Sequence, residues 1–124
     1  MDTYFTKEHE WVKIKEGIAS VGITEYAAHQ LGDITFVELP QEGKVVKQFE
    51  ALAGIESVKA ASDIYTPVSG QVVKVNTALE DRPEIVNEAA EDAGWIAWVK
   101  VADESELKNL MNREQYEAYV KGLE

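Results

Sequence analysis

Residues 55–67, IESVKAASDIYTP, place a single lysine, Lys59, among small and acidic residues and between two apolar, strand-like segments. Strand character rises to Ile55 and resumes at Ile64, so the chain should reverse direction near residues 57–60. A serine at the first turn position favours the reversal, because its hydroxyl can bond the backbone two residues further on. We therefore expect a hairpin whose turn carries Lys59, with no large neighbour to cover it.

Short apolar runs separated by Gly, Pro and Asp turns surround this hairpin over residues 10–101. Many short strands at close spacing are typical of a barrel or a sandwich, so we expect a mainly β fold. The runs that fit strands are WVKI, IASVGI, ITFVEL, KVVKQF, ALAGIES, DIYTPV, QVVKV and WIAWVKV.

A short internal similarity brackets the lysine. GKVVK begins at Gly43 and GQVVK at Gly70, an offset of 70 − 43 = 27 residues, and Lys59 lies nearly midway between them. Two strand units related by a pseudo-twofold axis and joined by one hairpin would place this lysine at the turn farthest from the rest of the fold. The alternative is chance repetition of a common strand pattern.

One helix is expected between the strands and two after them. In TEYAAHQLG, Thr24 is a suitable N-cap and Gly32 a suitable stop. Two later pairs of residues have the spacing of a helix cap and its reciprocal partner, which predicts two short helices over about 103–122. These pairs are Asp103 with Glu106 and Asn112 with Gln115.

The composition bounds the class of protein. The chain has 124 residues, 45% of them hydrophobic, which suits one modest core and a single domain over 1–124 with a central hairpin unit at about 43–76. Lys and Arg number 12 and Asp and Glu 23, so the net charge is −11. Such a surface repels phosphate backbones and anionic lipids, which argues against nucleic-acid and membrane partners and favours basic patches on other proteins.

The absence of cysteine excludes disulfides, zinc–thiolate sites and a thiol nucleophile. His9 and His29 are too few for most transition-metal sites, so no metal is expected. The N-terminus shows neither a basic nor an apolar signal region, and no window is long and apolar enough to span a bilayer. We expect a bacterial-type cytoplasmic protein, with a mature mitochondrial form left open.

Three interpretations of Lys59 compete. It is a solvated loop residue, a catalytic Schiff-base lysine, or the attachment point of a swinging prosthetic group. A Schiff-base lysine needs a lowered pKa, whereas Glu56 and Asp63 are the nearest ionisable residues in sequence and favour the charged amine. Covalent attachment needs only an exposed amine on a narrow projection, which the expected hairpin supplies.

Several segments resemble the H protein of the glycine cleavage system, in order from about Tyr4 to Tyr119. They are TKEHEWV, GIASVGITEYA, LGDITFVELP, ESVKAASDIYTPVSGQVVKVN and GWIAWVKV. Lipoyl domains of 2-oxo acid dehydrogenases more often have Asp before the lysine, and biotin carriers flank it with Met, whereas Val58 and Ala60 stand here. The resemblance implies a barrel-sandwich hybrid of the lipoyl/biotinyl type, with one internal short helix and C-terminal helices.

The resemblance also implies lipoate in amide linkage to Lys59, with Glu56, Ser57, Val58 and Ala60 forming the sequence around it that an attaching enzyme recognises. The implied function is that of a carrier with no catalysis of its own. Its lipoyl arm would take an aminomethyl group from a PLP-dependent glycine decarboxylase (P protein) to a folate-dependent aminomethyltransferase (T protein). A dihydrolipoyl dehydrogenase (L protein) would reoxidise the arm, and lipoyl-attaching enzymes would load it. A monomer is expected.

In the resembling family the loaded arm folds back into a cleft on the protein. By position, Glu10 and Asp63 would meet the cationic amine there, and Gln30 stands where related sequences often have His. The alternative for Glu10 is an ordinary charge on a strand surface, and His29 is interpreted as a residue of the helix surface.

Two other functions stay open from the sequence. One is an H-like lipoyl protein that acts in lipoate relay or in another lipoate-dependent pathway. The other is a structural interaction module whose lysine is never modified.

Overall fold

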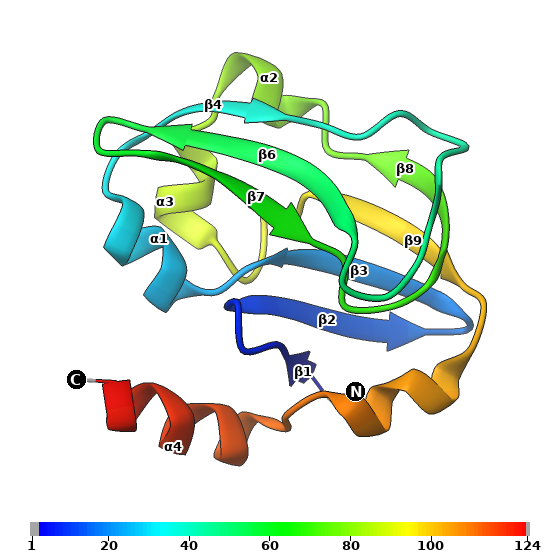
Figure 1. The fold of residues 1–124 in the computed structure, drawn as a ribbon. Helices are drawn as coiled ribbons and strands as arrows, with labels where there is room; N and C mark the ends of the chain where they lie inside the picture. The colour runs from blue at the N-terminus through cyan, green and yellow to red at the C-terminus, as the bar shows by residue number, and fades with distance from the viewer. Residues whose placement is uncertain (1–2, 124) are drawn as a thin grey trace.

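The computed structural model describes residues 3–123 as two antiparallel β-sheets packed face to face, with short helices at their margins (Figure 1). The larger sheet has the strand order β1-β2-β3-β9-β8-β5 and the smaller one β4-β6-β7. This arrangement confirms the mainly β, barrel-sandwich hybrid architecture, and the two sheets do not close into one barrel. The strands are β1 (Thr3–Phe5), β2 (Glu10–Lys15), β3 (Ile18–Ile23), β4 (Ile34–Glu38), β5 (Val45–Val46), β6 (Ala51–Ser57), β7 (Ala61–Tyr65), β8 (Gly70–Val75) and β9 (Ala97–Val101). The helices are α1 (Glu25–Leu31), α2 (Ala78–Asp81), α3 (Ile85–Ala89), the 3₁₀ helix η1 (Glu104–Asn109) and α4 (Arg113–Leu123).

The core lies between the two sheets. Side chains alternate between the two faces of a strand, so every second residue points inward. Val12, Val21 and Val99 of the larger sheet share one buried cluster with Ile55 and Ile64 of the smaller sheet. Burying such a side chain contributes about 1.5–3 kcal/mol, so this cluster holds the sheets together.

Helix α1 forms where the sequence predicts it. The Thr24 hydroxyl accepts a hydrogen bond from the Ala27 N–H at 3.2 Å and caps the helix. Gly32 ends the helix with φ at 79°, a backbone conformation that residues other than glycine rarely adopt.

The two C-terminal helices differ in how they begin. At α4 the expected cap is confirmed, because Asn112 N–H donates to Gln115 Oε1 at 2.9 Å and Gln115 N–H donates to Asn112 Oδ1 at 2.8 Å. At η1, Asp103 accepts a hydrogen bond from the Ser105 N–H at 2.9 Å. The prediction that the Glu106 side chain closes the cap is wrong.

The Glu106 carboxylate instead accepts from the Ser69 N–H at 2.7 Å and from the Ser69 hydroxyl at 2.6 Å. Glu106 therefore joins η1 to the segment before β8 rather than closing its own helix.

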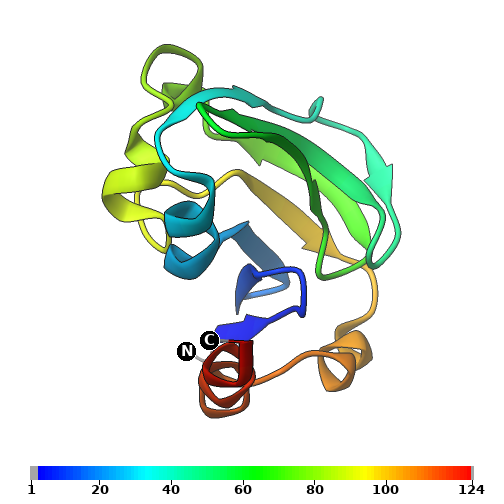
Figure 2. The same cartoon turned by 60° about the vertical axis from the view of Figure 1, so that its left-hand side comes forward.

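Helix α4 packs along the first strand, as Figure 2 shows at the base of the molecule. The rings of Phe5 and Tyr116 stack with centroids 4.5 Å apart. Phe5 also exchanges two backbone hydrogen bonds of 2.8 Å with Met111, just before the helix. The sequence did not predict β1, which depends on these distant partners.

Some strands are shorter than expected. Only Val45–Val46 of KVVKQF is a strand, because the chain then turns at residues 47–50 and Phe49 adopts a left-handed φ of 69°. Strand β7 ends at Tyr65 rather than continuing to Val68, where the Thr66 hydroxyl bonds locally to the Val68 backbone. Helices α2 and α3 were not predicted.

The two similar segments of the sequence pair with each other. In the larger sheet, β5 and β8 run antiparallel with Val45 opposite Gln71 and Val46 opposite Gly70. Gly70 is required at this place, because a Cβ there would lie 2.0 Å from the carbonyl oxygen of Lys100. An antiparallel pair is the arrangement that a pseudo-twofold relationship predicts.

The outward faces of the two sheets carry opposite charge. On the larger sheet, Lys13, Ser20, Trp98 and Lys74 lie in register across four strands, and the Lys74 ammonium lies 4.7 Å from the centre of the Trp98 ring. Lys100 projects from the same face, two residues along β9.

On the smaller sheet, Glu38, Gly54 and Asp63 are in register across its three strands, with Glu56 two residues from Gly54 along β6. The three carboxylates are exposed. The face next to the Lys59 turn is therefore acidic.

Candidate functional site

The chain reverses between β6 and β7 where the sequence predicts a turn. Ser57 N–H donates to the Ala60 carbonyl oxygen at 2.8 Å. The Ser57 hydroxyl oxygen accepts from the backbone N–H groups of Lys59 and Ala60, both at 3.1 Å. These bonds fix the shape of the turn, and the Lys59 side chain is exposed.

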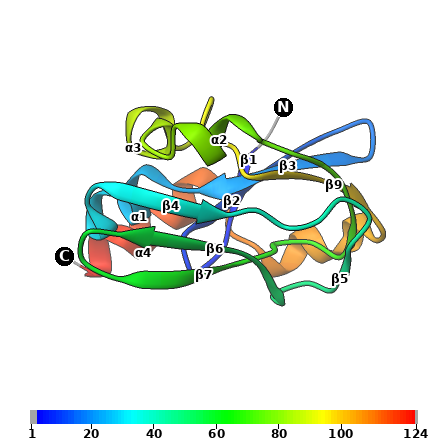
Figure 3. The same ribbon diagram turned by 90° about the horizontal axis from the view of Figure 1, so that it is seen from above.

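The turn does not lie apart from the rest of the fold, so that expectation is wrong. Val58 N–H donates to the carbonyl oxygen of Asp33 at 3.0 Å, in the connection between α1 and β4. A Cβ placed on Gly32 would lie 3.4 Å from the Lys59 Cε. Figures 1 and 3 show the β6–β7 turn at the same end of the molecule as α1.

The structure gathers the predicted recognition residues around the lysine. Glu56 and Ala60 are exposed on either side of the turn, and Ser57 is half-buried because its hydroxyl serves the turn. Val58 is 66% exposed although it is apolar. The residues around Lys59 thus present two apolar side chains, Val58 and Ala60, and one acidic side chain, Glu56, to solvent. Their role in recognition stays a prediction.

Glu10 is buried, with 2% of its surface exposed, so the alternative of an ordinary strand-surface charge is wrong. Its carboxylate accepts a hydrogen bond from the Thr6 hydroxyl and another from the Tyr65 N–H at 3.2 Å. Burial raises the pKa of Glu10 to about 7, against the opposing effect of these two hydrogen bonds. Glu10 therefore joins β2 to the outer edge of β7.

The other two predicted cleft residues are on the surface. Asp63 is exposed on the outward face of β7, two residues before Tyr65. Gln30 and His29 are exposed near the end of α1. The structure thus places Glu10 inside the protein and Asp63 and Gln30 outside it, and a common role toward a bound arm stays a prediction.

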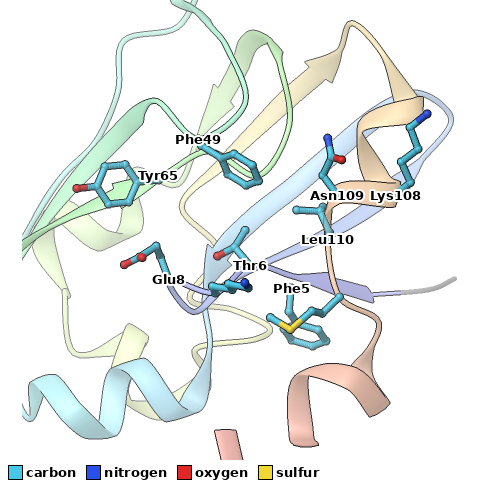
Figure 4. Close-up of a pocket in the computed structure, with 10 residues that line it drawn as sticks. Phe5, Thr6, Glu8, Phe49, Tyr65, Lys108, Asn109 and Leu110 are labelled. Carbon is cyan, nitrogen blue, oxygen red and sulfur yellow. The ribbon is translucent and has the colours of Figure 1, made fainter. Parts of the chain in front are cut away.

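A cavity of about 620 Å³ has both Thr6 and Tyr65 in its wall (Figure 4). These two residues are the hydrogen-bond partners of the Glu10 carboxylate, which is not itself part of the lining. Sequence reasoning missed this cavity because four separate segments build it. It is lined by Phe5, Thr6, Lys7, Glu8, Phe49, Tyr65, Lys108, Asn109, Leu110 and Met111.

Within residues 3–123, no three His, Cys, Asp or Glu side chains are grouped so as to hold a metal ion. None of the helices in this range has the length and apolar character needed to cross a membrane.

The fold and the turn together define the class of the protein. Two packed antiparallel sheets, with one exposed lysine at the turn of a hairpin in the smaller sheet, make a barrel-sandwich hybrid of the lipoyl/biotinyl type.

Comparison with known proteins narrows this class to one family. The family model described as "Glycine cleavage H-protein" matches residues 3–123. A glycine cleavage system H protein of Caulobacter vibrioides is 57% identical over 119 residues, which cover 96% of this chain and 98% of the relative. The glycine cleavage system H protein 4 of Aquifex aeolicus is 51% identical over 98% of this chain and 71% of its own length.

A solved structure agrees with the sequence comparisons. The crystal structure of a glycine cleavage system H protein from Mycobacterium marinum superposes with a TM-score of 0.89 at 35% identity, covering 97% of each chain. The chain belongs to the glycine cleavage H-protein family.

Proposed function

We propose that this chain is a lipoyl carrier of the glycine cleavage system, with lipoate in amide linkage to Lys59. The observation that carries the proposal is the exposed lysine in the Ser57–Ala60 turn of a chain that belongs to the H-protein family. An attaching enzyme needs an amine that it can enclose, and a hairpin turn offers one without any activation by the carrier.

The surroundings of Lys59 fit a long attached group. Ala60 and Ser62 are small and exposed, so they leave the ammonium uncovered. The stem of the lysine runs alongside Gly32, where a Cβ would lie in van der Waals contact with the Lys59 Cε at 3.4 Å. We propose that two exposed residues, Asp63 and Gln30, contact the attached group beyond the lysine stem.

The lipoyl group supplies the sulfur chemistry that accepts the aminomethyl group of glycine. The chain's own contribution is presentation. The Ser57 hydrogen bonds hold the turn, and Glu56 and Asp63 keep its surface acidic. An acidic carrier suits enzymes whose active-site openings are positively charged. Complementary charge raises the association rate and orients the two proteins as they approach each other.

In this proposal the chain performs no catalysis itself. It serves a PLP-dependent glycine decarboxylase, a folate-dependent aminomethyltransferase and a dihydrolipoyl dehydrogenase in turn, after a lipoyl-attaching enzyme has loaded it. The bacterial origin of the matched relatives supports a cytoplasmic location.

Peptide mapping after enzymatic lipoylation tests the proposal. The chain is incubated with a lipoyl-attaching enzyme, with and without lipoate, and its intact mass and its proteolytic peptides are measured. We expect one lipoyl group, on the peptide that holds Lys59. A group on Lys44, Lys47 or Lys74 instead would overturn the assignment of the turn.

A functional assay completes the test. The lipoylated chain should support glycine–bicarbonate exchange by a glycine decarboxylase, and the unmodified chain should not. Exchange that proceeds equally with both forms would contradict the carrier role.

A further inference from the structure

One asparagine clamps the loop that lies against the Lys59 turn. Asn87, in α3, donates from Nδ2 to the carbonyl oxygen of Gly32 at 2.8 Å. Its Oδ1 accepts from the Ile34 N–H, also at 2.8 Å. Both halves of the amide are used, and only this orientation of the amide satisfies both partners, since one is an acceptor and the other a donor.

The clamped residues flank the one that holds the turn. Asp33 lies between Gly32 and Ile34, and its carbonyl oxygen accepts from the Val58 N–H at 3.0 Å. Gly32 also faces the Lys59 side chain, with a Cβ position 3.4 Å from Cε and 3.7 Å from Cδ. A chain of contacts therefore runs from α3 through the loop to the backbone and the stem of the lysine.

Shape and placement of the turn have different origins. The Ser57 hydrogen bonds lie inside the turn, so they fix its shape but not its position on the protein. Two contacts connect the turn to the body of the fold: the bond from Val58 to Asp33, and the pairing of Ser57 with Ile34 at the start of β4. The loop that supplies Asp33 is in turn held on both sides by Asn87.

We propose that Asn87 is a positioning residue for Lys59. By clamping residues 32–34, it sets where the turn lies and the direction in which the lysine leaves it. An attaching enzyme then meets the amine in one orientation rather than in many. This inference rests on the proposed function, because it concerns modification of Lys59.

The test compares Asn87→Ala with Asn109→Ala in the full-length chain. Asn109 is a matched control, since it is also exposed and its side chain also donates a hydrogen bond, to Gln48 at 3.1 Å. It belongs to η1, drawn in orange in Figure 1, which lies at the other end of the molecule from the turn. Two quantities are measured: hydrogen exchange of the Val58 amide, and kcat/KM of a lipoyl-attaching enzyme acting on the unmodified chain.

Asn87→Ala loses both hydrogen bonds of the clamp. We expect at least about tenfold faster exchange at Val58, because the loss of even one ordinary hydrogen bond supports a change of that size. The kcat/KM for lipoylation should fall several-fold, while exchange in the core strands stays the same. Asn87→Asp keeps the acceptor for Ile34 but sets a second accepting oxygen against the Gly32 carbonyl oxygen, and two acceptors repel each other. It should therefore also speed exchange at Val58 and lower kcat/KM, although the side chain has nearly the same size. Asn109→Ala should match wild type in both measurements.

Any of three results would overturn the inference. The first is unchanged exchange at Val58 in Asn87→Ala, and the second is unchanged lipoylation despite faster exchange. The third is faster exchange in the core strands together with faster exchange at Val58, which would show a general loss of stability. If the wild-type chain accepts no lipoyl group, the proposed function fails, whereas the exchange comparison still decides whether Asn87 holds the turn.

Discussion

The carboxylate of Glu10 accepts a hydrogen bond from the backbone N–H of Tyr65 at 3.2 Å and so joins the two sheets. Tyr65 ends β7, the strand that begins just after the Lys59 turn, and Glu10 begins β2. An ionisable group therefore lies at the seam between the lysine-bearing hairpin and the rest of the protein.

Stability should fall as the pH rises through neutrality because of Glu10. Its pKa is about 7 in the folded protein and 4.5 ordinarily, so the folded state binds the proton more tightly. The resulting stabilisation is complete below about 4.5 and is lost as the pH rises through about 7, by at most roughly 3 kcal/mol. Urea unfolding between pH 5 and pH 8 measures this change.

Glu10→Gln serves as the comparison, because it keeps the size and polarity of the side chain without a titrating proton. Its NH₂ group replaces one of the two accepting oxygens, and this loss is the same at every pH. Burial lowers the pKa of His9, which acts in the opposite sense, but His9 is present in both proteins. The difference between them therefore isolates Glu10. Parallel stability curves for the two proteins would contradict the prediction.

Lys59→Arg should abolish lipoylation and leave the fold intact. Arginine keeps the charge, but its guanidinium cannot form the amide. The side chain is exposed, so the free energy of unfolding should change by no more than about 0.5 kcal/mol. Intact mass and urea unfolding check the two parts, and a lipoylated Lys59→Arg protein would show that another lysine is used.

Gly32→Ala should destabilise the protein and disturb Lys59, whereas Gly17→Ala should only destabilise it. Both glycines have a positive φ, 79° and 80°, and such conformations cost other residues about 1–3 kcal/mol. A Cβ at Gly32 meets the lysine stem at 3.4 Å, but one at Gly17 meets nothing within 4 Å.

Urea unfolding and the NMR shifts of the Lys59 side chain measure these two effects. Identical Lys59 spectra for Gly32→Ala and wild type would show that the loop does not constrain the lysine.

Tyr116→Phe should cost about 1–2 kcal/mol of stability. The Tyr116 hydroxyl bonds Thr24 Oγ1 and His9 Nδ1, each at 2.8 Å, in a buried setting. Tyr119→Phe is the control, because its hydroxyl makes a weaker, exposed bond to the Lys7 carbonyl at 3.3 Å and should change stability by less than about 0.5 kcal/mol. Equal losses in the two variants would mean that the Tyr116 hydroxyl adds nothing specific.

Local signals made the turn and α1 predictable from sequence. The Ser57 hydroxyl, the Thr24 cap and the Gly32 stop each act within three or four residues of their partners, and the structure confirms all three positions. Alternation of apolar residues likewise located most strands. Such features depend on neighbours along the chain, which a sequence displays directly.

Other features depend on distant partners and escaped prediction. The buried carboxylate of Glu10 bonds Tyr65, 55 residues away, so the sequence left open the alternative that Glu10 is an ordinary charge on a strand surface. Glu106 had the spacing of a capping residue, but it bonds Ser69 instead. The sequence did not predict a role for Asn87, because its two hydrogen-bond partners lie more than 50 residues earlier in the chain.

The opposite charge of the two outward faces has a consequence for diffusion. With Lys13, Lys74 and Lys100 on one side and Glu38 and Asp63 on the other, the outward faces of the two sheets contribute a dipole in addition to the net charge. In the field of a basic enzyme such a dipole experiences a torque, which turns the acidic hairpin face forward before any contact is made. Collisions are therefore enriched in the productive orientation, and added salt removes this advantage as the Debye length shrinks to about 10 Å at 0.1 M ionic strength.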